Sequence, residues 1–324
     1  MKSDKTLHAR TKEFAHENRL QSWWVVLSTA FLLLGTLAGT FPWLPWWARI
    51  FFSVLSGLLA VRLFVIYHDH QHRAILCRSH IADFFMRIFG IFVLCPSAIW
   101  RSSHDYHHAH NCKLRTANIG SYPIMTRENY QATPRGDRFK YLLMRHPLTI
   151  LFGYFTVFFL GMIIIPLLNN PRKHYESFLA LIVHVALGIT LLLLAGWSTL
   201  LLAMVLPLFI AGAIGSYLFY AQHNFPTVTL KDKAGWTFEG AALESSSHLR
   251  MHPLMNWFTA NIGYHHVHHL NHRIPFYRLP ETYRAMPELH GAKTTSLHPR
   301  DILRCLRLKV WCVETQRMVD LKGI

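Results

Sequence analysis

Long apolar runs constrain this chain more than any other feature of its sequence. About 20 apolar residues in a helix match the hydrocarbon layer of a membrane, which is about 30 Å thick. Four such runs occupy residues 23–41, 47–67, 178–196 and 199–220. The stretch FPWLPWW separates the first two, and Gly196 to Ser198 separate the last two. The pattern predicts an all-α integral membrane protein with four transmembrane helices in two hairpins.

Composition and charge support a membrane protein. Of the 324 residues, 52% are hydrophobic and 15% charged, and the mean hydropathy is +0.20. The net charge is +16, but Lys and Arg lie in segments beside the apolar runs, as in cytoplasmic loops of membrane proteins. No nucleic-acid-binding motif is present, so we expect no nucleic acid partner. The five cysteines form no C-x-x-C pair, which favours a reducing, cytosol-facing compartment.

Four short groups contain most of the chain's 23 histidines. HDHQH begins at His68, HDYHHAHN at His104 and HHVHH at His265, while FYAQHNF contains His223. The i, i+3, i+4 spacing inside the second and fourth groups places three imidazoles on one helical face. Neutral imidazole binds iron, copper, zinc and nickel. Eight or nine such ligands exceed the capacity of one ion, so the sequence predicts a dimetal site.

The same groups fix the expected topology. Groups that build one site must lie on one side of the membrane, so an even number of spans must separate them. We therefore expect residues 84–100 to be interfacial or to dip partway, and residues 147–168 to be amphipathic or re-entrant. Residues 1–324 then form a single domain, with a cytosolic helical cap from residues 68–146 and 221–324. Both termini and the active site are expected to be cytosolic.

Three of the groups also carry a family resemblance. HDHQH, HDYHH and HHVHH, in this order and after hydrophobic hairpins, resemble the three histidine boxes of the integral-membrane fatty acid desaturases. The stretch NIGYHHVHHLNHRIPFYRLPE resembles the last box of the delta-12 and omega-3 acyl-lipid type, and FYAQHNF resembles the segment that supplies an extra ligand. The resemblance implies nine metal ligands: His68, His72, His104, His107, His108, His223, His265, His268 and His269.

Several other polar residues accompany the nine. Asp69 and Asp105 each follow a box histidine and are expected to accept an imidazole N–H. Four further histidines fall where the family pattern needs none, and these are His70, His110, His266 and His272. His248 and His252 have i, i+4 spacing without a counterpart in the family, and they stay open as alternative ligands.

The resemblance implies an oxidoreductase: an oxygen-dependent desaturase that uses two iron ions (Fe2+/Fe3+) and O2 to introduce a cis double bond into a fatty acyl chain. The substrate is expected to be a fatty acyl lipid or acyl carrier that enters a tunnel from the membrane lipid. The chain has no haem, flavin or iron–sulfur signature, so electrons must come from an external donor such as ferredoxin or cytochrome b5 with its reductase. We expect that donor on a basic face that includes Arg101, Lys113, Arg115 and Arg138.

Alternatives remain at this stage. A diiron lipid hydroxylase or a carotenoid ketolase or hydroxylase would use a similar ligand set. A divalent-metal transporter or sensor would place polar ligands at mid-membrane depth, whereas these histidines follow the ends of the apolar runs. The C-terminal segment at residues 301–313 is basic and amphipathic, so it is expected either on a lipid surface or against the cap.

Overall fold

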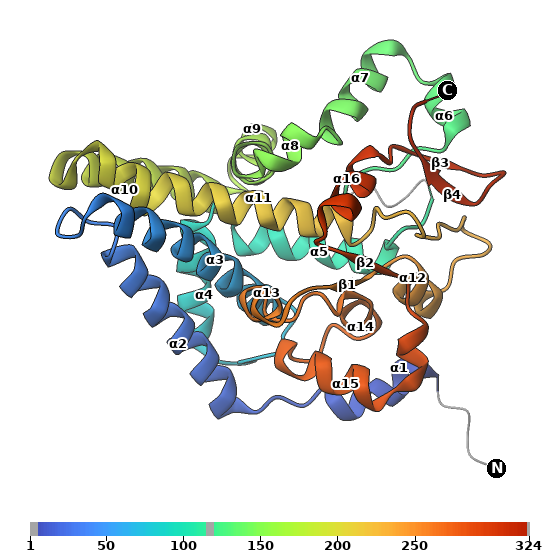
Figure 1. Cartoon of the computed structure of the whole chain (residues 1–324), viewed down its shortest axis with the longest axis horizontal. Helices are drawn as coiled ribbons and strands as arrows, with labels where there is room; N and C mark the ends of the chain where they lie inside the picture. The colour runs from blue at the N-terminus through green and yellow to red at the C-terminus, as the bar shows by residue number, and fades with distance from the viewer. Residues whose placement is uncertain (1–5, 115–119, 323–324) are drawn as a thin grey trace.

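The computed structural model describes residues 6–114 and 120–322, and Figure 1 shows that helices dominate it. Arg115, which we expected on the basic face, lies outside the described residues. Within the described part, three helices are long and apolar enough to cross a membrane, or up to four if a bent pair counts as one span. The three are α2 (Arg19–Ala38), α3 (Trp46–Gln71) and the segment Tyr175–Ala221. The bent pair is α4 (His80–Phe92) and α5 (Ser97–His110), which meet at 91°.

The segment Tyr175–Ala221 folds back on itself at Gly196. It consists of α10 (Tyr175–Leu200), a π-helical turn η3 (Leu201–Val205) and α11 (Leu206–Ala221). Gly196 has φ 80° and ψ 168°, a conformation that glycine adopts without a side-chain penalty. A Cβ placed on Gly188 would lie 3.8 Å from the side chains of Leu200 and Met204, so the two halves pack together. The chain therefore turns where the sequence predicts a hairpin.

Residues 147–169 lie against α11. They form α8 (Pro147–Leu151), the π-helix η2 (Tyr154–Ile164) and α9 (Ile165–Asn169). A Cβ on Gly212 would lie 2.6 Å from the backbone N of Tyr154, so glycine permits this close approach. The apolar helix from Tyr154 to Asn169 is shorter than the three candidate spans.

The elements outside the helices described so far are called the cap below. Its helices are α1 (Leu7–Arg10), η1 (Thr11–Phe14), α6 (Arg127–Ala132), α7 (Arg135–Met144), α12 (Phe238–Glu244), α13 (Pro253–Phe258), α14 (His265–Leu270), η4 (Phe276–Arg278), α15 (Leu279–Ala285), η5 (Pro287–Gly291) and α16 (Pro299–Arg307). The cap also contains two small β-sheets, which the all-α prediction from the sequence did not include. Strand β1 (His248–Arg250) pairs in parallel with β2 (Thr294–Ser296), and β3 (Val310–Cys312) pairs antiparallel with β4 (Arg317–Val319).

Both ends of the described chain pack onto this cap. At the N-terminal end, Nδ1 of His8 lies 2.7 Å from the carbonyl O of Leu270, and Asn271 donates to the Thr11 hydroxyl at 3.0 Å. In the C-terminal segment, Cys305 and Trp311 are fully buried. Of the two expectations for residues 301–313, packing against the cap is therefore the one that the structure supports.

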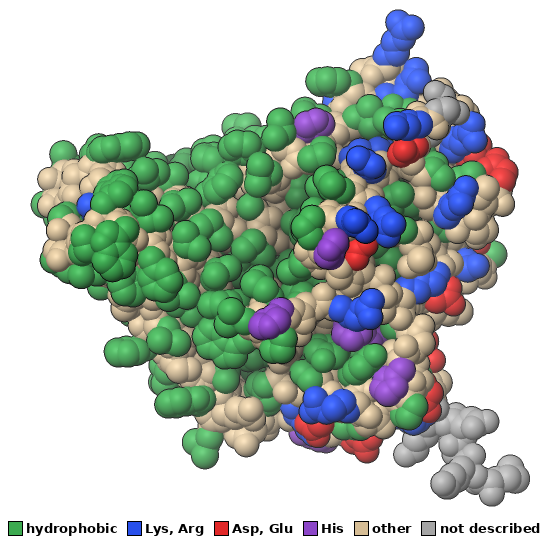
Figure 2. Space-filling model, in the orientation of Figure 1, with side chains coloured by type: hydrophobic (Ala, Val, Ile, Leu, Met, Phe, Trp, Pro, Cys, Tyr) green, Lys and Arg blue, Asp and Glu red, His purple; other side chains and the backbone are tan. Residues whose placement is uncertain are grey.

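The surface separates into two halves. Figure 2 shows apolar side chains over the part that holds α2, α3, α10 and α11, whereas charged side chains gather over the cap. The exposed tryptophans Trp43, Trp46 and Trp47 lie in and beside the turn between α2 and α3. This division is typical of a protein with one half in a membrane and one half in water.

Candidate metal centre

The nine predicted ligands lie together in two groups of buried histidines. No member is more than 6% exposed. Within each group, the nitrogens available for a metal all lie within 4.8 Å of one another. The first group contains five members and the second four: His68, His72, His104, His108 and His268, then His107, His223, His265 and His269.

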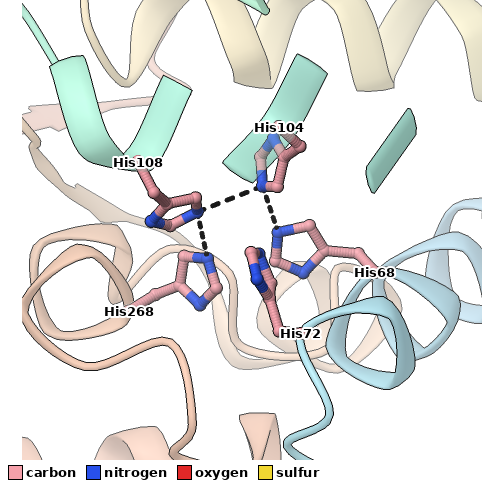
Figure 3. A group of neighbouring side chains, drawn as sticks. All are labelled: His68, His72, His104, His108 and His268. Carbon is pink, nitrogen blue, oxygen red and sulfur yellow. Dashed lines mark hydrogen bonds between the residues drawn. The ribbon is translucent and has the colours of Figure 1, made fainter. Parts of the chain in front are cut away.

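The first group joins α3, α5 and α14, as Figure 3 shows. Nε2 of His104 lies 2.9 Å from Nε2 of His68 and 3.1 Å from Nε2 of His108. Nε2 of His268 lies 3.2 Å from Nε2 of His108. His72 ends α3, and its ring centroid lies 4.6 Å from that of His68. The five rings thus point toward a common centre.

The second group joins α5, α14 and the residues after α11. Nε2 of His223 lies 3.1 Å from Nε2 of His107 and 2.9 Å from Nε2 of His265. Nε2 of His269 lies 3.1 Å from Nε2 of His265. His223 is held by a hydrogen bond between its Nδ1 and the carbonyl O of Ser245, 3.0 Å apart.

Helical spacing divides the histidines of α5 and α14 between the two groups. On α5, His104 and His108 are one turn apart and join the first group, whereas His107 joins the second. On α14, His265 and His269 join the second group and His268 the first. The groups are therefore neighbours.

The donor set fits two metal ions. Nδ1 of His68 lies 3.2 Å from the Asp69 carboxylate, and Nδ1 of His223 faces a carbonyl, so each ring holds its proton at Nδ1 and presents a lone pair at Nε2. Several such lone pairs face one another and repel each other electrostatically. A metal cation bound between them would remove this repulsion. All-imidazole sets suit iron, copper, zinc or nickel better than magnesium or calcium.

Burial keeps eight of these imidazoles neutral. It holds the pKa of seven of them well below the usual range: His72, His104, His107, His108, His265, His268 and His269. The pKa of His223 falls to about 4 for the same reason. Neutral imidazole is the form that binds a metal, so the site is prepared for one near pH 7.

The two expected carboxylate acceptors differ. Asp69 is fully buried, contacts His68, and accepts a hydrogen bond from the backbone N of Phe276 at 2.6 Å. Asp105 has a side chain that is 61% exposed, and its carboxylate is 4.0 Å from Nδ1 of His72. That distance is longer than a hydrogen bond. Of the two carboxylates, Asp69 is therefore the one that links a ligand, His68, to the segment after α14, at Phe276.

The other histidines lie outside the two groups. His70 points to Asp83, with 3.2 Å between Nε2 and Oδ1, and His110 stacks on Tyr106. His248 stacks on Tyr264. The His252 side chain accepts from Leu254 at the start of α13, and the buried His266 packs beside Tyr283. The sequence alternative that placed His248 and His252 among the ligands therefore receives no support from the geometry.

Two further residues line the site: Trp100, which the sequence did not single out, and His272, which the sequence analysis named as a histidine beyond the nine ligands. Trp100 stacks on His104 with 4.7 Å between ring centroids. His272 lies 4.8 Å from His72 and 5.2 Å from His108, again between ring centroids. Trp100 and His104 are one helical turn apart, so their contact follows from spacing once α5 is known. The position of His272 depends on the turn after α14, which spacing alone does not define.

An apolar cavity of about 570 Å³ reaches both groups. His68 and His104 of the first group and His265 of the second line one end. Side chains of α3, η2 and α11 line the rest, and almost all of them are apolar. A cavity of this size and lining accepts an elongated apolar ligand.

Comparisons with known proteins agree with this site. A family model described as fatty acid desaturase matches residues 43–299. A fatty acid desaturase of Bacillus subtilis (strain 168) is 30% identical over 84% of this chain and 77% of the relative. The sn-1 oleoyl-lipid 12-desaturase of Synechocystis sp. is 23% identical over 86% of this chain and 80% of its own. The sn-1 acyl-lipid omega-3 desaturase (ferredoxin) of Nostoc sp. is 24% identical, with 80% and 73% covered.

Proposed function

Because the chain belongs to the fatty acid desaturase family, we propose that it is a membrane oxidoreductase that introduces a cis double bond into a lipid acyl chain. The observation that carries the proposal is the meeting of an apolar cavity with two groups of buried, neutral imidazoles. The reaction converts –CH2–CH2– and O2, with two electrons and two protons from outside, into –CH=CH– and two molecules of water.

We propose iron for both groups, one ion held by the five imidazoles and one by the four. When bound, the iron pair supplies the oxidising power that removes hydrogen from an unactivated methylene, which no side-chain acid or base can do. The chain's own residues hold the ligands and orient the substrate. Asp69 fixes the ring of His68, and the Ser245 carbonyl fixes the ring of His223.

The cavity is the proposed acyl site. Phe64 and Val65 of α3 and Leu208 and Leu218 of α11 are among its apolar lining residues, which exclude water from the reacting carbons. An acyl chain that fills the cavity would place its methylenes next to His68, His104 and His265. A lipid-linked chain can enter from the bilayer, and two of the relatives are named for acyl-lipid substrates.

We also propose four spans, with the cap and both termini in the cytosol. The Gly196 turn divides the segment Tyr175–Ala221 into two helices, which gives four with α2 and α3. Lys and Arg are dense between residues 101 and 145 and sparse in the two hairpin turns, as the positive-inside rule requires for cytosolic loops. One relative is named as ferredoxin-dependent, which supports an external one-electron donor.

Product analysis tests the function. Cells that express the chain should gain a new unsaturated fatty acid methyl ester in gas chromatography with mass spectrometry, and cells that express His268→Ala should not. The variant must be present in the membrane in equal amount. An oxygenated lipid in place of the alkene would instead establish a hydroxylase or ketolase.

A further inference from the structure

On one side of the first group, Nδ1 of His72 lies 4.0 Å from the carboxylate of Asp105, whose side chain is 61% exposed. His272 is half-buried, and its ring lies against the rings of His72 and His108. By contrast, His223 of the second group lies behind Ser245 and Cys112, which are both buried. His272 therefore lies between solvent and the first group and covers this side of it.

Three exposed arginines surround this cover. Arg73 follows His72 in the chain, and Arg273 follows His272. Arg101 donates to the Gln71 side chain at 2.9 Å, one residue before His72. Arg101 and Arg73 are both close enough to Asp105 to oppose the rise that burial causes in the pKa of that carboxyl group. The carboxylates near these arginines are Asp105 and, beside His70, Asp83, so three positive charges meet two negative ones.

We propose that the surface formed by Arg73, Arg101, Arg273 and His272 is the docking site for an acidic one-electron carrier protein. The inference rests on the proposed function and adds the place where electrons enter. Each docking event oxidises the carrier by one electron and reduces the metal pair by one. Two events supply the two electrons that, with two protons and two hydrogen atoms of the acyl chain, reduce O2 to two waters.

Charge and distance both favour this surface. Electron transfer weakens steeply with distance, and on this side the half-buried His272 lies in ring contact with His72 and His108 of the first group. A positive patch raises the encounter rate with an acidic partner and orients it. Two other residues of the expected basic face contact aromatic rings. Lys113 lies over the ring of Trp236, and Arg138 of α7 lies over the ring of Tyr130 in α6.

The test compares two ways of reducing the same purified enzyme. An acidic [2Fe–2S] ferredoxin with its reductase must dock, whereas dithionite with a small neutral mediator need not. For Arg73→Glu and Arg273→Glu we expect about tenfold weaker binding of ferredoxin in isothermal titration calorimetry at low salt. We also expect about a tenfold lower kcat/KM for ferredoxin and a shallower salt dependence. Turnover with dithionite should change less than twofold. The matched control is Arg138→Glu, which should leave both unchanged.

Three results would overturn the proposal. One is an equal loss with dithionite, which would mean damage to the metal site. The second is an equal effect of Arg138→Glu, or no salt-dependent reduction of the unaltered enzyme by ferredoxin. The third is a loss that appears only in nanodiscs with anionic lipid and not in neutral ones, since the arginines would then bind lipid phosphate. Desaturation with dithionite in the unaltered enzyme separates all three from a failure of the proposed function.

Discussion

The two histidine groups share two helices and differ in the third. Both draw ligands from α5 and α14, but the first takes His68 and His72 from α3, whereas the second takes His223 from the end of α11. These unshared helices pack directly against each other: a Cβ on Gly57 would lie 2.8 Å from Cβ of Ile210. The distance between the groups is thus set by helix packing in the apolar half, while α5 and α14 together supply six of the nine ligands.

The two groups differ most clearly in their number of ligands, which is five in the first and four in the second. His72→Ala leaves four imidazoles in the first group, whereas His223→Ala leaves three in the second. We expect both to lower the rate of desaturation more than about 100-fold. This loss exceeds the usual loss on removing a residue that only hydrogen-bonds to a metal ligand. Iron measured by plasma mass spectrometry should stay near two per chain in His72→Ala and fall to about one in His223→Ala. His16→Ala, at an exposed histidine, is the control. Equal iron loss in both variants would break the comparison.

A carboxylate supports the first group alone. Asp69→Asn weakens both the contact with His68 and the bond from the Phe276 backbone. We expect activity to fall about 10- to 100-fold. Asp105→Asn, at the exposed carboxylate, should change it by less than about threefold. Product formation at equal protein and iron content measures both, and similar losses in the two variants would mean that burial of the carboxylate is irrelevant.

The cavity meets both groups, so a change in its width should affect where the chain lies and leave the metals in place. A Cβ on Gly215 would have only Phe158 nearby, at 3.9 Å, so a larger side chain can extend into the cavity. We expect Gly215→Leu to shift the double-bond position or the accepted chain length, with iron unchanged. Ala213→Leu, on the same helix and outside the cavity lining, is the control. An unchanged product pattern in Gly215→Leu would place the acyl chain elsewhere.

The smallest effect on activity is expected from a change at Cys112, which lies beside His223 of the second group. Burial raises the pKa of the Cys112 thiol to about 12, so the sulfur stays protonated below that pH. A thiol without its negative charge is a poor metal ligand. Cys112→Ala should therefore keep two irons and change activity less than about twofold, with the same profile from about pH 6 to about pH 9. Loss of one iron would show that the sulfur is a ligand.

The sequence predicts the parts of this site that one helix determines. The spacings in 104–108 and 265–269 predict imidazoles on one helical face that could meet at one metal, whereas the structure divides each set between the two groups. Gly196 marks a turn between apolar runs. Contacts between distant segments are not encoded in such periodicity. The bond from Phe276 to Asp69, the place of His272 and the pairing of β1 with β2 all depend on how the cap closes. The basic face for the electron donor stays a prediction, because charge in sequence does not say which surface an arginine occupies.

The packing of residues 8–11 on residues 270–271 has a consequence for biogenesis. The ribosome makes the N-terminal helix and the first two histidine groups long before α14. While the membrane helices insert, residues 8–11 therefore lack residues 270–271, which they contact in the folded protein. Four of the nine ligands, His223 included, are made only after residue 220. Metal loading must then be a late event, and a nascent or truncated chain that lacks α14 would expose imidazoles to water without completing either site.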